Sequence, residues 1–243
     1  NAATTDEHGN LYFTAGYAPD SFSVPSLFYM YQPDNKRLKR IVPPTTMPLG
    51  FANAIFADHQ GHLYMTQGFM RSGQPTSEAG RGWYRYDSAT AHWQRLADLP
   101  VGLGYVTLTG NNDGTILLFG GSIDAGQQHQ TNRVYLYDIA SNSWSQSATS
   151  MPQQISGASG CSVWPGQFVI VGGYNPVSQQ SLNTVWLFDM QHSKPAHWPP
   201  FQAMAASWGQ PLATIKDTYM SFVVPTILKS QHVISWNSSY NQT

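Results

Sequence analysis

The chain has 243 residues, which is long enough for one all-β domain with a sizeable core. Charged residues make up only 10% and the formal net charge is −1, so the composition argues against nucleic acid and anionic membrane surfaces as partners. No apolar stretch reaches the roughly 20 residues that a membrane helix needs, so we expect no membrane insertion by this segment.

Short apolar runs recur along the whole chain, bounded by Gly, Asn and Asp. Each run is too short for a helix and is rich in β-branched and aromatic residues, which predicts strands joined by loops. The apolar residues do not alternate with polar ones, so we expect both faces of these strands to be buried. In chain order, the paired runs span residues 9–17 and 27–34, 61–69 and 83–87, 114–121 and 134–138, 166–173 and 185–189, and 218–224 and 232–237.

These paired runs are copies of one another. The turn before the first run of each pair recurs at steps of 52, 53 and 52 residues, at Gly9, Gly61, Gly114 and Gly166, and a fifth turn follows at Asp217. Self-similarity at a period of roughly 50 residues in a strand-rich chain indicates a β-propeller.

The third copy carries the fullest motif. Its first run ends in Gly120-Gly121, its second run ends in Tyr137-Asp138, and Trp144 follows six residues after the Asp. This combination resembles the kelch repeat, which is also found in the central domain of galactose oxidase, and the resemblance implies one four-stranded propeller blade for each copy. The fourth copy matches well, whereas the others depart from the motif, with Leu38 replacing Trp in the first, Gly68 alone in the second, and Val223-Val224 with Trp236-Asn237 in the fifth.

The motif residues have structural explanations. Glycine at a strand end permits a positive φ or a close backbone approach, so the chain can leave the sheet. The Asp after the Tyr begins a turn in which its carboxylate can accept local backbone N–H groups. The Trp fills the wide space between diverging blades and has an N–H available for a partner. We therefore expect Gly, Tyr and Trp of the motif to support the fold and not a functional site.

The repeats predict a single all-β domain, a kelch-type β-propeller of about five four-stranded blades. The blades would span approximately residues 1–50, 51–103, 104–156, 157–209 and 210–243, with the last blade lacking its outer strand. The alternative is a fragment of a six- or seven-bladed propeller, because the last copy stops before its outer strand and the resemblance implies that six or seven blades are more usual. An additional segment or another chain would then complete the last blade, because an unpaired strand edge invites pairing.

No catalytic motif is recognisable, and we expect neither a cofactor nor a metal site. His59 and His62 flank a turn and are explained as polar turn residues. The resemblance raises two enzyme alternatives: copper-radical oxidases, which use a Tyr cross-linked to a Cys, and sialic-acid mutarotases. The single cysteine, Cys161, falls within an expected inner strand, where a small buried residue is the simpler explanation.

The sequence therefore favours a non-catalytic binding or assembly module. Loops between the second and third strands of each blade should emerge on the same face as the links between blades, and loops on a rigid scaffold commonly carry function. A protein partner or self-assembly is the first hypothesis because Tyr and Arg favour protein hot spots, and glycan binding is the alternative. The candidate binding residues are Tyr17, Asp20, Phe22, Phe69, Arg71, Arg81, Asp124, His129, Arg133, Tyr174, Asn175 and Asn183.

Two sequons bear on the compartment. Asn237 and Asn241 each head an Asn-x-Ser/Thr pattern and are glycosylation candidates if the chain is secreted. Together with the low charge, they favour an extracellular or cell-surface setting, with the cytoplasm as the alternative.

Overall fold

A computed structural model describes residues 2–15, 27–58, 60–70, 78–110 and 113–190, and it assigns two short strands further along the chain, at 226–227 and 233–234. Within these residues the regular elements are all β-strands, as expected. The predicted loop residues Tyr17, Asp20, Phe22 and Arg71 lie outside the described residues, as do both sequon asparagines, Asn237 and Asn241.

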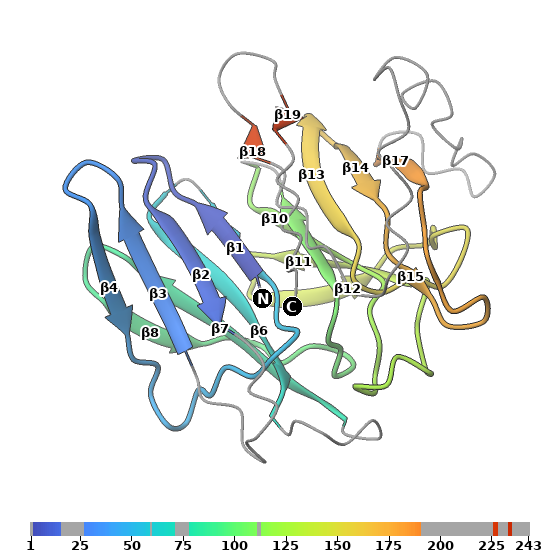
Figure 1. The fold of residues 1–243 in the computed structure, drawn as a ribbon, viewed down its shortest axis with the longest axis horizontal. Coiled ribbons are helices and arrows are strands. Elements are labelled where there is room, and N and C mark those ends of the chain that lie inside the picture. Colours follow the sequence, from blue (N-terminus) through green and yellow to red (C-terminus); the bar gives the residue numbers. More distant parts are fainter. Residues whose placement is uncertain are drawn as a thin grey trace, which may run out of the picture.

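Four antiparallel sheets follow one another along the chain (Figure 1). The first contains β1 (Ala2–Thr5), β2 (Leu11–Ala15), β3 (Leu27–Gln32) and β4 (Arg37–Ile41). The second contains β5 (Ile55–Ala57), β6 (His62–Phe69), β7 (Ala79–Asp87) and β8 (His92–Arg95). The third contains β9 (Thr107–Gly110), β10 (Thr115–Phe119), β11 (Val134–Asp138) and β12 (Ser143–Gln146).

The fourth sheet contains three described strands: β13 (Ser159–Trp164), β14 (Gln167–Val171) and β17 (Val185–Asp189). A small hairpin of β15 (Tyr174–Asn175) and β16 (Gln180–Ser181) lies between β14 and β17 in sequence. A second small antiparallel pair consists of β18 (Thr226–Ile227) and β19 (Val233–Ile234), and β19 falls within the predicted run 232–237.

The sheets are blades of a propeller. Each pairs its strands in sequence order, and the first strands of neighbouring sheets contact one another, β1 with β5, β5 with β9 and β9 with β13. The kelch-type propeller expected from the repeats is therefore confirmed, with four blades in the described part of the chain. The fourth strand of blade four and most of the proposed fifth blade lie outside the described residues, so the blade limits and the total of five remain predictions.

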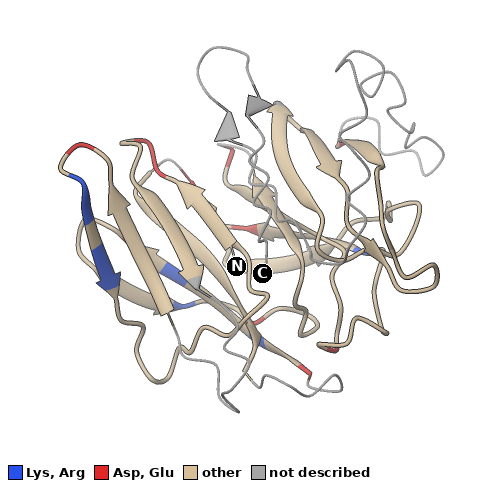
Figure 2. Cartoon of the chain, viewed as in Figure 1, with Lys and Arg blue, Asp and Glu red and all other residues tan. Residues whose placement is uncertain are grey.

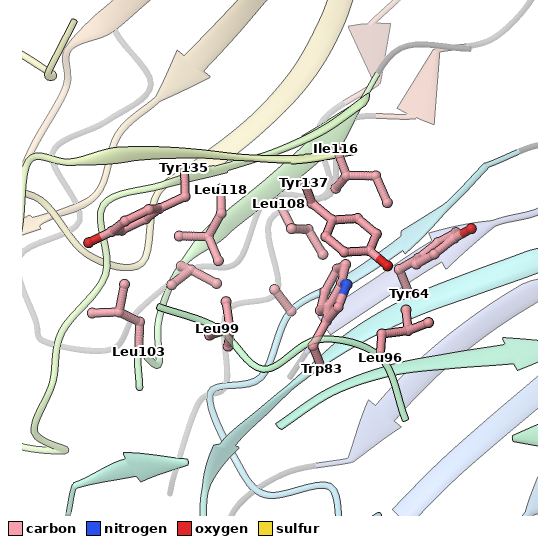
Figure 3. Close-up of a cluster of buried hydrophobic side chains, with 12 residues drawn as sticks. Tyr64, Trp83, Leu96, Leu99, Leu103, Leu108, Ile116, Leu118, Tyr135 and Tyr137 are labelled. Carbon is pink, nitrogen blue, oxygen red and sulfur yellow. The ribbon is translucent and has the colours of Figure 1, made fainter. Parts of the chain in front are cut away.

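The hydrophobic core lies between neighbouring blades. Figure 3 shows the cluster between blades two and three, where the rings of Tyr64 and Trp83 meet that of Tyr137. The Trp83 and Tyr137 rings lie 5.4 Å apart, edge to face. Similar clusters join blade one to blade two and blade three to blade four. Both faces of the middle blades are thus buried, as the continuous apolar runs predict.

The motif Trp joins one blade to the blade before it. Trp144 of β12 donates its indole N–H to the carbonyl of Ala97 in the link after blade two, at 3.0 Å, and its ring lies 5.2 Å from that of Trp83. Leu38 faces Tyr31 in the register that Trp144 has with Tyr137, which confirms that Leu38 takes the Trp position in blade one. The predicted role of this position between blades is confirmed for Trp144.

The motif Asp organises a turn in two blades. The Asp87 carboxylate accepts the backbone N–H groups of Ala89 and Thr90, both at 2.9 Å. The Asp138 carboxylate accepts both the N–H and the hydroxyl of Ser141, each at 2.6 Å. These bonds lower the pKa of Asp87 and Asp138, because they stabilise the ionised carboxyl.

One predicted loop is shorter than expected. The predicted runs 61–69 and 83–87 imply a loop between them, but β7 already begins at Ala79 and pairs with the end of β6. The pairing passes an irregularity between Thr66 and Gly68. Gly80 and Gly82 leave space for the Gln67 side chain, whose oxygen accepts the Gly82 N–H at 3.1 Å. Strand pairing continues past the irregularity because the Gln67 side chain replaces a missing backbone hydrogen bond between β6 and β7.

A candidate binding face

The loop face is the surface built by the links between blades and the loops that follow the second strand of each blade. We define it as residues 50–54, 67–70, 78–80, 102–106, 120–133, 153–158 and 172–184. In three successive blades the link forms an isolated antiparallel bridge with the loop: Phe51 with Phe69, Gly104 with Ser122, and Ser156 with Tyr174. The expectation that links and loops share one face is confirmed by these bridges.

A backbone ladder connects the links of three blades. The Tyr105 N–H donates to the Ala52 carbonyl at 2.8 Å, and the Gly157 N–H donates to the Tyr105 carbonyl at 2.7 Å. All three residues have a positive φ, of 53°, 54° and 65° in chain order. They occupy the same position of successive repeats, so the ladder fixes the loop face from one blade to the next.

Asp124 holds the loop of blade three together from inside. Its carboxylate accepts the backbone N–H of Gln128 at 3.0 Å and that of His129 at 2.7 Å. The same carboxylate lies 2.9 Å from Nδ1 of His129. Only 10% of the Asp124 side chain is exposed, against 76% of the His129 side chain. The buried carboxylate thus supports an exposed imidazole.

The electrostatics of this loop favour the ionised carboxylate. Burial alone raises the pKa of Asp124, but the N–H groups of Gln128 and His129 and the imidazole of His129 outweigh it, so the pKa is lowered. The loop is also tied to blade two, because the Ala79 N–H donates to the Ile123 carbonyl at 2.8 Å. The predicted candidates Asp124 and His129 therefore lie together in one anchored loop.

A polar bridge joins the same loop to blade four. The buried Ser156 hydroxyl accepts from Nε2 of Gln130 at 2.7 Å and donates to Oε1 of Gln127 at 2.5 Å. Gln130 is only 6% exposed, and its Oε1 has no hydrogen-bond partner among the described residues. The loop of blade three consequently contacts blades on both sides of it.

Aromatic rings support the face beside this loop. Phe69 is fully buried, with its ring 5.2 Å from that of Phe51 and 5.4 Å from that of Tyr105. The Tyr105 hydroxyl donates to the Ala125 carbonyl at 3.2 Å. Phe69, which we expected to contact a partner, lies beneath the surface, because the link residues Phe51 and Tyr105 pack against its ring.

The other candidates lie elsewhere on or near the face. Arg81 donates from Nε to the Leu99 carbonyl at 2.6 Å, and Arg133 lies 3.5 Å from the Tyr135 hydroxyl. Tyr174 and Asn175 form β15, where the Asn175 side chain accepts the Val177 N–H at 2.8 Å, and Asn183 is exposed. The Arg81, Arg133 and Asn175 side chains are thus held within their own blade or loop.

The sequence did not single out the residues that support the loop face, namely Phe51, Tyr105, Gln127, Gln130 and Ser156. The repeat contained a usable signal, because Ala52, Tyr105 and Gly157 stand 53 and 52 positions apart. That spacing would have placed the neighbouring residues just before successive inner strands.

The described residues also bear on metal binding, on the Cys161 thiol and on membrane-spanning helices. No group of three His, Cys, Asp or Glu side chains there is arranged to hold a metal ion. Cys161 lies in the inner strand β13, as expected, and burial raises the pKa of its thiol. Nor do the described residues include a helix of the length and apolarity needed to cross a membrane.

The chain is similar to a family of kelch-repeat domains and to a curated enzyme. A family model described as the KLHDC2/KLHL20/DRC7 Kelch-repeats domain matches residues 1–220. A curated relative named N-acetylneuraminate epimerase, from Yersinia enterocolitica serotype O:8 / biotype 1B, is 30% identical over 135 residues. That match covers 53% of this chain and 32% of the relative, so it spans about a third of the relative's length.

Proposed function

Because the chain belongs to the kelch-repeat family of β-propeller domains, we propose that it is a binding or assembly module whose loop face holds a protein partner. The observation that carries this proposal is the anchored loop of blade three, in which buried Asp124 supports exposed His129. A loop fixed before binding loses little conformational entropy when a partner docks. The loop face therefore offers a partner a surface that is already formed before binding.

The chemistry of the loop face suits a protein. It combines the His129 imidazole, which the Asp124 carboxylate holds, with the exposed Arg133 and the half-buried rings of Tyr105 and Tyr174. Aromatic and Arg side chains are enriched among the residues that dominate protein interfaces. The loops of blades three and four differ in sequence, whereas a multivalent sugar-binding propeller would present similar side chains in each repeat.

Paired histidine variants test this proposal. His129→Ala removes an exposed side chain from the loop face, and His92→Ala removes an exposed side chain from β8, away from that face. In affinity capture from the native source followed by mass spectrometry, His129→Ala should lose a partner that the wild type and His92→Ala retain. Identical partner sets for all three proteins would show that this loop is not the binding surface.

A second candidate function is an enzyme acting on a sugar acid. The relative named N-acetylneuraminate epimerase favours it, as does the polar cluster in which Asp124 and His129 adjoin the Gln127–Ser156–Gln130 bridge. The test is proton NMR of N-acetylneuraminate with and without the chain. Faster exchange between its anomers, lost in His129→Ala, would support the enzyme, and unchanged exchange would remove it.

We also propose that the module acts outside the cell or at its surface. The support is the pair of sequons at Asn237 and Asn241 and the low content of charged residues. The intact mass of native material, measured before and after deglycosylation, tests this. Sugar mass on either asparagine supports the proposal, and a bare chain from the native source contradicts it.

A further inference from the structure

The outer strand of blade one differs from the other outer strands. The residues of β4 from Arg37 to Arg40 are all exposed, whereas β8 and β12 each half-bury their Trp. Leu38, which replaces the Trp, is 61% exposed, and Val42 just beyond the strand is 69% exposed. Blade one therefore presents a fully exposed stretch of outer strand where blades two and three half-bury a ring.

This strand also concentrates positive charge. Lys36, Arg37, Lys39 and Arg40 are four of the 12 Lys and Arg residues in the chain. Figure 2 shows the resulting basic strand β4 at one edge of the molecule. Among the described residues none of the four forms an ion pair, whereas Arg95 of β8 pairs with Asp98 at 2.8 Å. The overall charge of −1 conceals this local excess.

The backbone of β4 is available on one side. The strand order β1-β2-β3-β4 leaves the outer edge of β4 without a neighbouring strand in the described structure. Such an edge presents unpaired N–H and C=O groups, which another extended chain can pair with. Successive side chains alternate between the two faces of the sheet, so Arg37 and Lys39 lie on one face and Leu38 and Arg40 on the other.

We propose that the outer edge of β4 binds an extended acidic segment of a partner protein, which adds a fifth strand to blade one. Charge complementarity selects the partner, because side chains directly opposite on adjacent strands lie within about 5.5 Å and opposite charges there are stabilising. A second copy of this chain is disfavoured, because its β4 would place like charges opposite one another. Leu38 offers the partner an apolar contact between the basic side chains.

The test uses a fluorescein-labelled heptapeptide of alternating Glu and Val as the probe, with binding to the full chain followed by fluorescence anisotropy. Arg40 faces Tyr29 in the register that Arg95 has with Tyr84, so the two arginines occupy the same repeat position. We expect Arg40→Glu to weaken probe binding about tenfold. The matched control Arg95→Glu should leave binding unchanged.

Three further measurements separate edge pairing from simple charge attraction. The double variant Arg37→Glu/Arg40→Glu should lose the acidic probe and gain a Lys-Val heptapeptide, which also shows that the variant is folded. An acidic probe N-methylated at alternate residues should fail to bind, because it cannot complete the backbone ladder. Equal binding of the N-methylated probe would overturn strand addition.

Vesicles of phosphatidylcholine and phosphatidylserine test the other source of negative charge. We expect the wild-type chain to bind the acidic probe in the presence of vesicles. Displacement of the probe by vesicles, with vesicle binding lost in Arg40→Glu, would overturn the proposal in favour of a membrane surface. The loop face is unaltered in every variant, so the outcome is independent of the function proposed for that face.

Discussion

Replacing Gly120 by Ala tests how closely blades three and four approach one another. Gly120 has a φ of 60°, and a Cβ there would lie 2.4 Å from the Ile155 carbonyl oxygen. Gly114 is the matched control, because it has a φ of 87° but nothing within 4 Å of the corresponding Cβ. Both variants incur the cost of a left-handed backbone, about 1–2 kcal/mol. Only Gly120→Ala also forces neighbouring backbone apart.

The additional cost follows from what must move. The Ile155 carbonyl accepts the Gly121 N–H at 2.8 Å, so its displacement weakens a hydrogen bond worth about 0.5–1.5 kcal/mol. Overpacking adds about 1–3 kcal/mol. We therefore expect Gly120→Ala to be about 2–4 kcal/mol less stable than Gly114→Ala.

Thermal unfolding followed by tryptophan fluorescence measures this difference. For a domain of this size, each kcal/mol lowers Tm by about 2–4 °C, so Gly120→Ala should melt at least about 4 °C below Gly114→Ala. Equal melting temperatures for the two variants would refute the close approach of the Gly120 backbone to the link before blade four.

Three other predictions follow from interactions in the structure. Trp144→Phe should lower the free energy of unfolding by about 1–2 kcal/mol, because it removes the hydrogen bond to Ala97, and an unchanged urea midpoint would contradict that role. Burial, together with the nearby Asp58, raises the pKa of Tyr64 to about 12, so folded chains keep a proton that unfolded chains lose above pH 10. The free energy of unfolding should hence be constant up to about pH 9 and fall by at least roughly 1.4 kcal/mol per pH unit between pH 10 and 12, since burial also raises the pKa of Tyr84, Tyr86 and Tyr137; urea titrations in which Tyr64→Phe falls as steeply as the wild type would count against a buried, protonated Tyr64. Asp124→Asn should speed hydrogen exchange at the His129 amide about tenfold or more with little change in Tm, and unchanged exchange would mean that the carboxylate does not hold the loop.

The repeated elements were predictable because each depends on local chemistry. The Asp138 turn requires only a carboxylate followed by nearby N–H groups, and its role was inferred before the fold was known. A Trp recurs six residues after the motif Asp, as Trp144 does after Asp138. A large ring at the widening rim of a blade has few other places to pack. Copies in register allowed each strand to be located from the others.

The loop face was less predictable because tertiary contacts determine it. Nothing in the sequence around Phe69 indicates that Phe51 and Tyr105, 18 and 36 positions away, pack against its ring, so Phe69 was expected on the surface. Asp124 was correctly placed in a loop, but its carboxylate points inward to N–H groups four and five residues ahead. The polar bridge through Ser156 joins residues 26 and 29 positions apart, which a single sequence does not reveal.

The ladder through Ala52, Tyr105 and Gly157 has a consequence for how this surface can change over evolution. Its hydrogen bonds use main-chain groups alone, and its three equivalent positions carry side chains as different as those of Ala, Tyr and Gly. Substitutions along it can alter what the surface displays without cutting the connection between blades. The molecule thus separates the part that keeps its shape from the part that is free to acquire new partners.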